Sequence, residues 1–295
     1  MLRTFTLATG LALLAPAAVH AQAAFTAEVS GRGTPVLFIP GLTNNGEVWR
    51  STAAEFARDH EVHVLSLAGF AGAPPVATDP GWLERQRDAI VAYIRERRLD
   101  RPVLVGHSLG GVLALWIAVE HPELPSAVVN IDGLPFIGAT MNPDATAESM
   151  RPMAEQMRTM MSSPNAKENY LRMQGAQLRM MVHDSAAQAM LARHGRDSDM
   201  ATMAVAMYDM WRLDLRADLA RVRVPVLNLH AWIAYESMGQ TRAAVERLMT
   251  GQYATLADAT LRIHDQAYHF IMLDEPEWTQ REMRDFLARV AAMRR

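Results

Sequence analysis

The sequence predicts an α/β fold, in which a mostly parallel, doubly wound sheet carries an inserted helical cap. Short apolar runs alternate with helical segments over residues 25–133 and again over 221–295, which is typical of a parallel sheet with helices on both faces. Residues 134–220 carry no strand pattern and read as helices, so we expect them to form the cap. A Gly-His-Ser-Leu-Gly turn at residues 106–110 joins an apolar strand to an apolar helix.

The first half of the chain predicts four strands and two helices before the glycine-rich turn. Continuous apolar runs predict buried strands, and spaced apolar residues predict helices. In chain order the elements are an edge strand at Phe25–Ser30, a strand at Val36–Ile39, a helix at Glu47–Arg58, a strand at Val62–Leu67, a loop over 68–80, a helix at Trp82–Arg98 and a strand at Val103–Val105.

The second half predicts three more strands around the cap. In chain order these elements are a helix from Gly111, a strand at Val128–Ile131, the helical residues 134–220, a strand at Pro225–Leu229, a helix at Thr241–Leu248, a strand at Thr260–Ile263 and a helix at Glu277–Met293.

Residues 1–21 have the pattern of a secretory signal peptide. Arg3 precedes an apolar run from Leu7 to Ala15, and Val19-His-Ala21 offers small residues for cleavage. Cleavage after Ala23 or Ala24 is an alternative, and so is an uncleaved anchor, although the run is short for a bilayer span. No other stretch has the pattern of a span, so we expect a soluble mature chain that is periplasmic or secreted.

The composition limits the kinds of ligand and partner that we expect this chain to bind. The 295 residues carry a formal net charge of −3, and this mildly acidic balance gives no reason to expect nucleic-acid binding. The absence of cysteine excludes disulfides and thiolate sites. His60 and His63 are three residues apart in or beside a strand, which places them on opposite faces. We therefore predict no metal and no cofactor.

Ser108 is the candidate nucleophile. A strand before it and a helix after it give the Gly-x-Ser-x-Gly turn the context of a nucleophile elbow, which lifts the hydroxyl from the sheet edge. The N–H of Leu109, at the start of the helix, then points to where an oxyanion would form. The structural alternative is an ordinary strand-to-helix turn with a capping serine.

This arrangement resembles the α/β-hydrolase family over nearly the whole mature chain. The resemblance implies the chain order nucleophile, acid, base. It points to His269 as the base, because this histidine follows the last strand and precedes apolar residues and an acidic-Pro helix start. Two alternatives are His264, which lies in the strand itself, and His107, which flanks the nucleophile.

The acid departs from the pattern common in that family. Many members carry an aspartate in the loop after the strand equivalent to Val226–Leu229. Here Ile233 or Ala234 occupies that position, and Glu236 is the carboxylate within reach in that loop.

Asp132 is the preferred candidate for the acid. It ends the strand that follows the elbow, and some family members place their acid there. Its role would be to orient His269 and to stabilise the imidazolium. Glu236 is the alternative acid, Asp265 or no acid is a further one, and Asp132 before Gly133 is also typical of an ordinary turn.

An oxyanion hole needs a second backbone donor besides Leu109. The resemblance implies that the residue after Gly41, which is Leu42, supplies it. Pro40 replaces the histidine often found before that glycine, but the donor is a backbone group.

Fourteen of the twenty methionines lie between residues 134 and 220. Methionine is flexible and polarizable, so these side chains suit an adaptable apolar pocket under a lid. The alternative is that most of them fill the cap's own core. Copper binding by thioethers is set aside because helical periodicity explains the spacing. The two helical series are Met150, Met153, Met157, Met160, Met161 and Met200, Met203, Met207, Met210.

The predicted function is an exported serine hydrolase that cleaves ester-like bonds of hydrophobic small molecules through an acyl-enzyme on Ser108. One alternative is a catalytically vestigial, hydrolase-like ligand-binding protein, and another is an acyltransferase that uses the same acyl-enzyme. The sequence leaves the substrate, the leaving group and the oligomeric state open.

Overall fold

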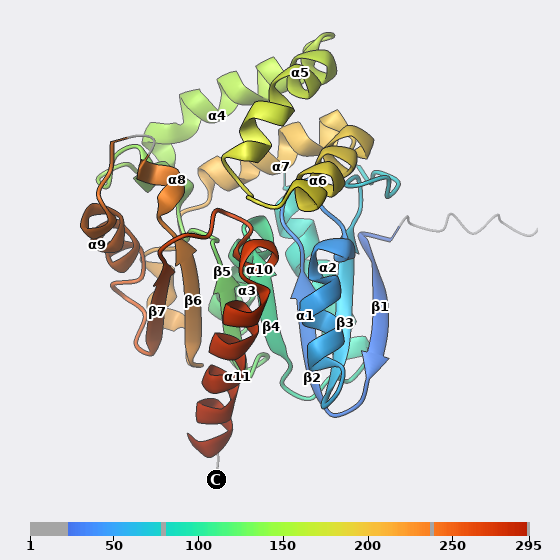
Figure 1. Ribbon diagram of the computed structural model, residues 1–295, viewed down its shortest axis with the longest axis vertical. Helices are drawn as coiled ribbons and strands as arrows, with labels where there is room; N and C mark the ends of the chain where they lie inside the picture. The colour runs from blue at the N-terminus through green and yellow to red at the C-terminus, as the bar shows by residue number, and fades with distance from the viewer. Residues whose placement is uncertain (1–22, 78–80, 237–238, 294–295) are drawn as a thin grey trace, which may run out of the picture.

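The computed structural model describes residues 23–77, 81–236 and 239–293. Within them, seven strands form one sheet in the order β1-β3-β2-β4-β5-β6-β7 (Figure 1). All neighbouring pairs are parallel except β1 with β3, so the predicted fold class is confirmed. The strands are β1 (Phe25–Gly31), β2 (Thr34–Ile39), β3 (His60–Leu67), β4 (Val103–His107), β5 (Ala127–Ile131), β6 (Val226–Ala231) and β7 (Ala259–His264).

Helices cover both faces of the sheet because its central strands are apolar on both sides. Leu37 and Ile39 of β2 pack with α2 (Trp82–Glu96) and α3 (Leu109–Glu120). Val36 and Phe38 point to the other face, where they pack with α1 (Arg50–Phe56) and α11 (Pro276–Met293). The alternation along one strand thus divides the core into two layers.

Four longer helices lie between β5 and β6, over the carboxyl-terminal edge of the sheet (Figure 1). They are α4 (Ala147–Met161), α5 (Ala166–Arg179), α6 (Ser185–Asp197) and α7 (Met200–Arg212), with the short helices η2 (Ile137–Thr140) and η3 (Asp218–Arg221) at the two ends. A small core of their own, which includes Phe136, Met150 and Trp211, joins α4 to α7. The helices therefore form a cover above the strand tips.

Several helix boundaries differ from the sequence prediction. The segment predicted as a helix at Glu47–Arg58 begins as the 3-10 turn η1 (Gly46–Trp49) before α1. The side chain of Asn45 accepts from the Glu47 N–H, and Gly46 N–H donates to the Ser66 hydroxyl, so side-chain acceptors hold this first turn. Short helices that were not predicted are α8 (Ile233–Glu236) and α10 (Ile271–Asp274), and α9 spans Arg242–Gln252.

The predicted signal peptide, residues 1–21, lies outside the described residues. Among the helices in the described ranges, none combines the length and apolar character that a bilayer crossing requires.

Candidate functional site

Ser108 lies at the junction between β4 and α3 in a strained backbone conformation. Its φ of 52° and ψ of −119° lie outside the regions favoured by residues with a side chain. Its N–H donates to the Ile131 carbonyl at 2.8 Å, and its own carbonyl accepts from Val112 at 3.0 Å. The fold thus holds the residue in a conformation that costs energy, which is common at functional sites.

The tight turn around Ser108 requires glycine at positions 106 and 110, because a side chain would not fit at either position. A Cβ atom at Gly106 would lie 2.1 Å from the Gly110 carbonyl oxygen, and one at Gly110 would lie 2.2 Å from the Ile39 carbonyl oxygen. Both distances are too short for any side chain. The glycines of the motif therefore allow β2, β4 and α3 to approach one another closely.

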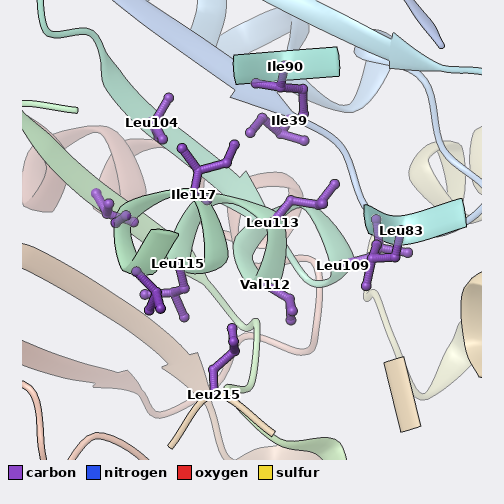
Figure 2. Packing of buried hydrophobic residues seen from close by; sticks show 14 of the residues in the cluster. Ile39, Leu83, Ile90, Leu104, Leu109, Val112, Leu113, Leu115, Ile117 and Leu215 are labelled. Carbon is purple, nitrogen blue, oxygen red and sulfur yellow. The ribbon is translucent and has the colours of Figure 1, made fainter. Parts of the chain in front are cut away.

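Helix α3 is buried on all sides, which fixes the position of the turn. Figure 2 shows Leu109, Leu113 and Ile117 of α3 packed among Ile39, Leu83, Ile90 and Leu104 from the neighbouring elements. Leu109 itself is fully buried. Because its side chain is held in the core, its N–H keeps one direction at the helix start.

His269 and Asp132 are hydrogen-bonded across the site. His269 lies between β7 and α10, and its Nδ1–H donates to Asp132 Oδ2 at 2.7 Å. Asp132 directly follows β5 and has a φ of 51°. This contact fixes the His269 tautomer, so that Nε2 is left without a proton and can accept one.

Ser108, Asp132 and His269 line one cavity of about 720 Å³, which we call the reaction cavity. None of the hydrogen bonds among the described residues joins the Ser108 hydroxyl to His269. Such catalytic hydrogen bonds are often long or poorly aligned until substrate binds. The cap supplies apolar walls to this cavity, including Met180, Met181 and Met210.

His107 anchors the loop that carries His269. Its Nε2–H donates to the backbone carbonyl of His269 at 3.0 Å, and the two rings lie 4.6 Å apart. Burial, together with the neighbouring His269, lowers the pKa of His107 to about 3. His107 is therefore neutral at physiological pH and bonded through its proton to a carbonyl, which suits a positioning residue and not a base.

The two candidate oxyanion donors, the N–H groups of Leu42 and Leu109, belong to segments that lie next to Ser108. A Cβ atom at Gly41 would lie 3.1 Å from the Ser108 Cβ atom, so the loop after β2 passes directly beside Ser108. The Leu42 N–H donates to no acceptor within the described ranges. As the first residue of α3, Leu109 has no partner for its N–H inside the helix. Both groups are thus available to a ligand.

A second histidine, His230, holds the other oxygen of Asp132. His230 is fully buried at the end of β6, and its Nδ1 lies 3.1 Å from Asp132 Oδ1. The Ala231 N–H donates to the same oxygen at 3.1 Å. On its far side, His230 Nε2 lies 2.8 Å from the Tyr253 hydroxyl. The Tyr253 hydroxyl also donates to the Gly133 carbonyl at 2.8 Å. His230 donates from Nδ1, because the ionised Asp132 carboxylate can only accept.

These donors keep Asp132 ionised. Burial raises the pKa of Asp132, but the hydrogen bonds from His230 and His269 lower it by more, and its pKa lies well below the ordinary value. Its charge is therefore present across the physiological range and can stabilise an imidazolium at His269.

The other sequence candidates lie away from this contact. Glu236 is exposed at the end of α8, and Asp265 pairs with Arg242. His264 Nδ1 accepts the Ala267 N–H at 2.9 Å, which uses it within its own turn. Among the described residues, no group of three His, Cys, Asp or Glu side chains could hold a metal ion.

Sequence reasoning missed His230 and Tyr253. The available signal is that a histidine directly follows a buried strand, next to the loop where an aspartate is common in the resembled family. The contact itself joins residues 98 positions apart, which one sequence does not reveal.

Most of the chain matches one known protein family. Residues 36–281 match the model described as the alpha/beta hydrolase family. The chain belongs to the alpha/beta hydrolase family. This confirms the predicted family and the predicted enzyme class.

Two curated relatives share about a quarter of their aligned residues with this chain. The pimeloyl-[acyl-carrier protein] methyl ester esterase of Vibrio cholerae is 25% identical over 280 residues, covering 89% of this chain and 97% of that protein. The protein of the same name from Vibrio atlanticus is 24% identical over 219 residues, covering 68% and 77%.

Solved structures share the fold. MenH from S. aureus has a TM-score of 0.73 at 14% identity, over 90% of this chain and 98% of that one. An esterase from Exiguobacterium antarcticum has a TM-score of 0.73 at 15% identity, over 90% and 95%. The enol-lactonase from Burkholderia xenovorans has a TM-score of 0.69 at 16% identity, over 90% and 96%.

Replacing Asp132 tests which carboxylate serves His269. Asp132→Ala should lower the turnover number for a 4-nitrophenyl ester by roughly 10⁴-fold, because the histidine loses both its orientation and its counter-charge. Glu236→Ala is the matched control and should keep wild-type turnover. Full activity in Asp132→Ala, or a comparable loss in Glu236→Ala, would contradict the assignment.

Replacing His230 tests whether its hydrogen bond positions Asp132 and keeps it ionised. His230→Leu removes a hydrogen bond to a charged group and raises the pKa of Asp132, so kcat should fall about 10- to 100-fold with little change in KM. His230→Asn keeps an N–H donor at the δ position and should recover most of the loss. Steady-state kinetics on folded variants decide this, and an asparagine variant no better than the leucine variant would refute the role.

Proposed function

We propose that this protein hydrolyses carboxylic esters of hydrophobic small molecules through an acyl-enzyme on Ser108. The observation that carries the proposal is the 2.7 Å contact between His269 and Asp132 in the cavity that Ser108 also lines. A hydroxyl nucleophile needs a base, and a base needs a partner that fixes its tautomer.

Each residue has one role in the proposed reaction. The Ser108 hydroxyl attacks the ester carbonyl carbon and gives its proton to His269 Nε2. The oxyanion accepts hydrogen bonds from the Leu42 and Leu109 N–H groups. The carbon–oxygen bond to the alcohol then breaks, and the alcohol takes the proton from His269. A water molecule, deprotonated by His269, releases the acid and restores Ser108.

The proteins compared above support this choice of substrate class. The Vibrio cholerae relative is named for a methyl ester, and the Exiguobacterium structure is named an esterase. The apolar lining of the reaction cavity, with Leu134, Ile137 and Leu248 beside the methionines, favours hydrophobic substituents over sugars or phosphates.

A fluorophosphonate probe tests the proposed nucleophile. The purified protein should be labelled at Ser108, with loss of hydrolysis of a short 4-nitrophenyl ester, and Ser108→Ala should escape labelling. A folded protein that is not labelled, or is labelled elsewhere, would exclude the proposed chemistry. Free acid as the product, with no new ester when an alcohol is added, separates hydrolysis from acyl transfer.

We also propose that the chain is exported and processed. The positive residue, short apolar run and small residues of positions 1–21 support this. N-terminal sequencing of the protein recovered outside the cytoplasm should begin at Gln22, or at Ala24 or Phe25 for the later cleavage sites. Recovery of an intact N-terminus from the cytoplasm alone would contradict export.

A further inference from the structure

A second cavity lies within the cap. Its volume is about 540 Å³, and helices α4, α5 and α7 line it together with Leu42 from the loop after β2. We call it the methionine cavity, because its walls include seven methionines: Met157, Met160, Met161, Met173, Met200, Met203 and Met207. These side chains give an apolar surface that adapts to the shape of a flexible ligand.

The methionine cavity adjoins the reaction cavity. Gln177 lines both. On α7, Met203 and Met207 line the methionine cavity and Met210, one turn further on, lines the reaction cavity. Along α5, Met173 lines the methionine cavity, and Met180, which directly follows the helix, lines the reaction cavity, with Gln177 between them. Two helices thus run past both cavities, which form consecutive compartments under the cap.

Leu42 brings the methionine cavity close to Ser108. It lines the methionine cavity, and its N–H is a candidate oxyanion donor next to Ser108. Ser108 and His269 both line the reaction cavity and are absent from the described lining of the methionine cavity. The two substituents of a bound ester would therefore meet different surroundings.

The proton transfer from His269 to the leaving alcohol determines which part of the ester lies in the reaction cavity and which in the methionine cavity. The leaving alcohol must receive its proton from His269 Nε2, so its oxygen must face the reaction cavity. The acyl chain extends from the other side of the carbonyl carbon. It therefore points past Leu42, toward the methionines.

We propose that the methionine cavity binds the acyl chain of the substrate, and that the protein is selective for esters of medium- and long-chain acids. This inference rests on the proposed hydrolysis at Ser108. The outer end of the cavity is open, since Met160 and Met173 are 63% and 70% exposed. Chains longer than the cavity can reach solvent there, so selectivity should level off with length and not fall sharply.

A series of 4-nitrophenyl esters with one leaving group measures this selectivity. From acetyl to dodecanoyl, kcat/KM should rise by up to about fourfold per buried methylene and then level off. A flat or falling profile, with the acetyl ester hydrolysed and Ser108 labelled, would overturn the acyl-chain assignment and leave the proposed function standing. No hydrolysis of any ester, without labelling, would remove both.

A matched pair of methionine variants tests whether the methionine cavity causes the selectivity for long acyl chains. Met207→Gln puts an amide in the wall of the methionine cavity and should lower the dodecanoyl-to-acetyl ratio of kcat/KM at least about tenfold. Met190→Gln makes the same change on α6 at a half-buried residue that lines neither cavity, and it should keep the wild-type ratio. An equal effect in both variants would refute the location.

A second series distinguishes the two arms of the ester. Acetates of alcohols of increasing chain length vary the leaving group alone, and Met207→Gln should leave their relative kcat/KM values as in the wild type. A loss confined to this alcohol series would show that the methionine cavity holds the alcohol, which contradicts the proposal.

Discussion

The carboxylate of Asp132 joins three parts of the chain that are far apart in sequence. It follows β5, accepts from His230 and Ala231 on β6, and accepts from His269 in the loop after β7. A buried carboxylate is stable only when such donors replace its lost water. The site therefore depends on this residue staying charged, because a protonated Asp132 could neither hold both histidines nor counter an imidazolium.

His230 occupies the strand end near which many members of the family carry their acid. In this chain the candidate acid, Asp132, follows the neighbouring strand, since Ile131 and Leu229 are register partners and Asp132 and His230 come directly after them. A carboxylate at either tip can reach a histidine from the last loop. The chain thus keeps the charge at the same edge of the sheet and places a hydrogen-bond donor, His230, at the second position.

The sequence was sufficient to predict the sheet and the elbow because their signals are local. Continuous apolar runs such as Val36–Ile39 give buried parallel strands, and the Gly-His-Ser-Leu-Gly pattern of the elbow lies within five consecutive residues. His230 and Tyr253 were not predictable, because their roles arise from packing between β5, β6 and the end of α9. The split of the Glu47–Arg58 helix was missed for a related reason, since Ser66 on β3 supplies one of the acceptors.

The most direct test of the account is the structure of the protein after Ser108 reacts with a 4-nitrophenyl alkylphosphonate. The phosphorus should be bonded to the Ser108 oxygen, with one phosphoryl oxygen within about 3 Å of both the Leu42 and Leu109 nitrogens, and with His269 Nε2 facing another oxygen. Reaction at a different residue, or a phosphoryl oxygen remote from both N–H groups with His269 turned away, would contradict the account.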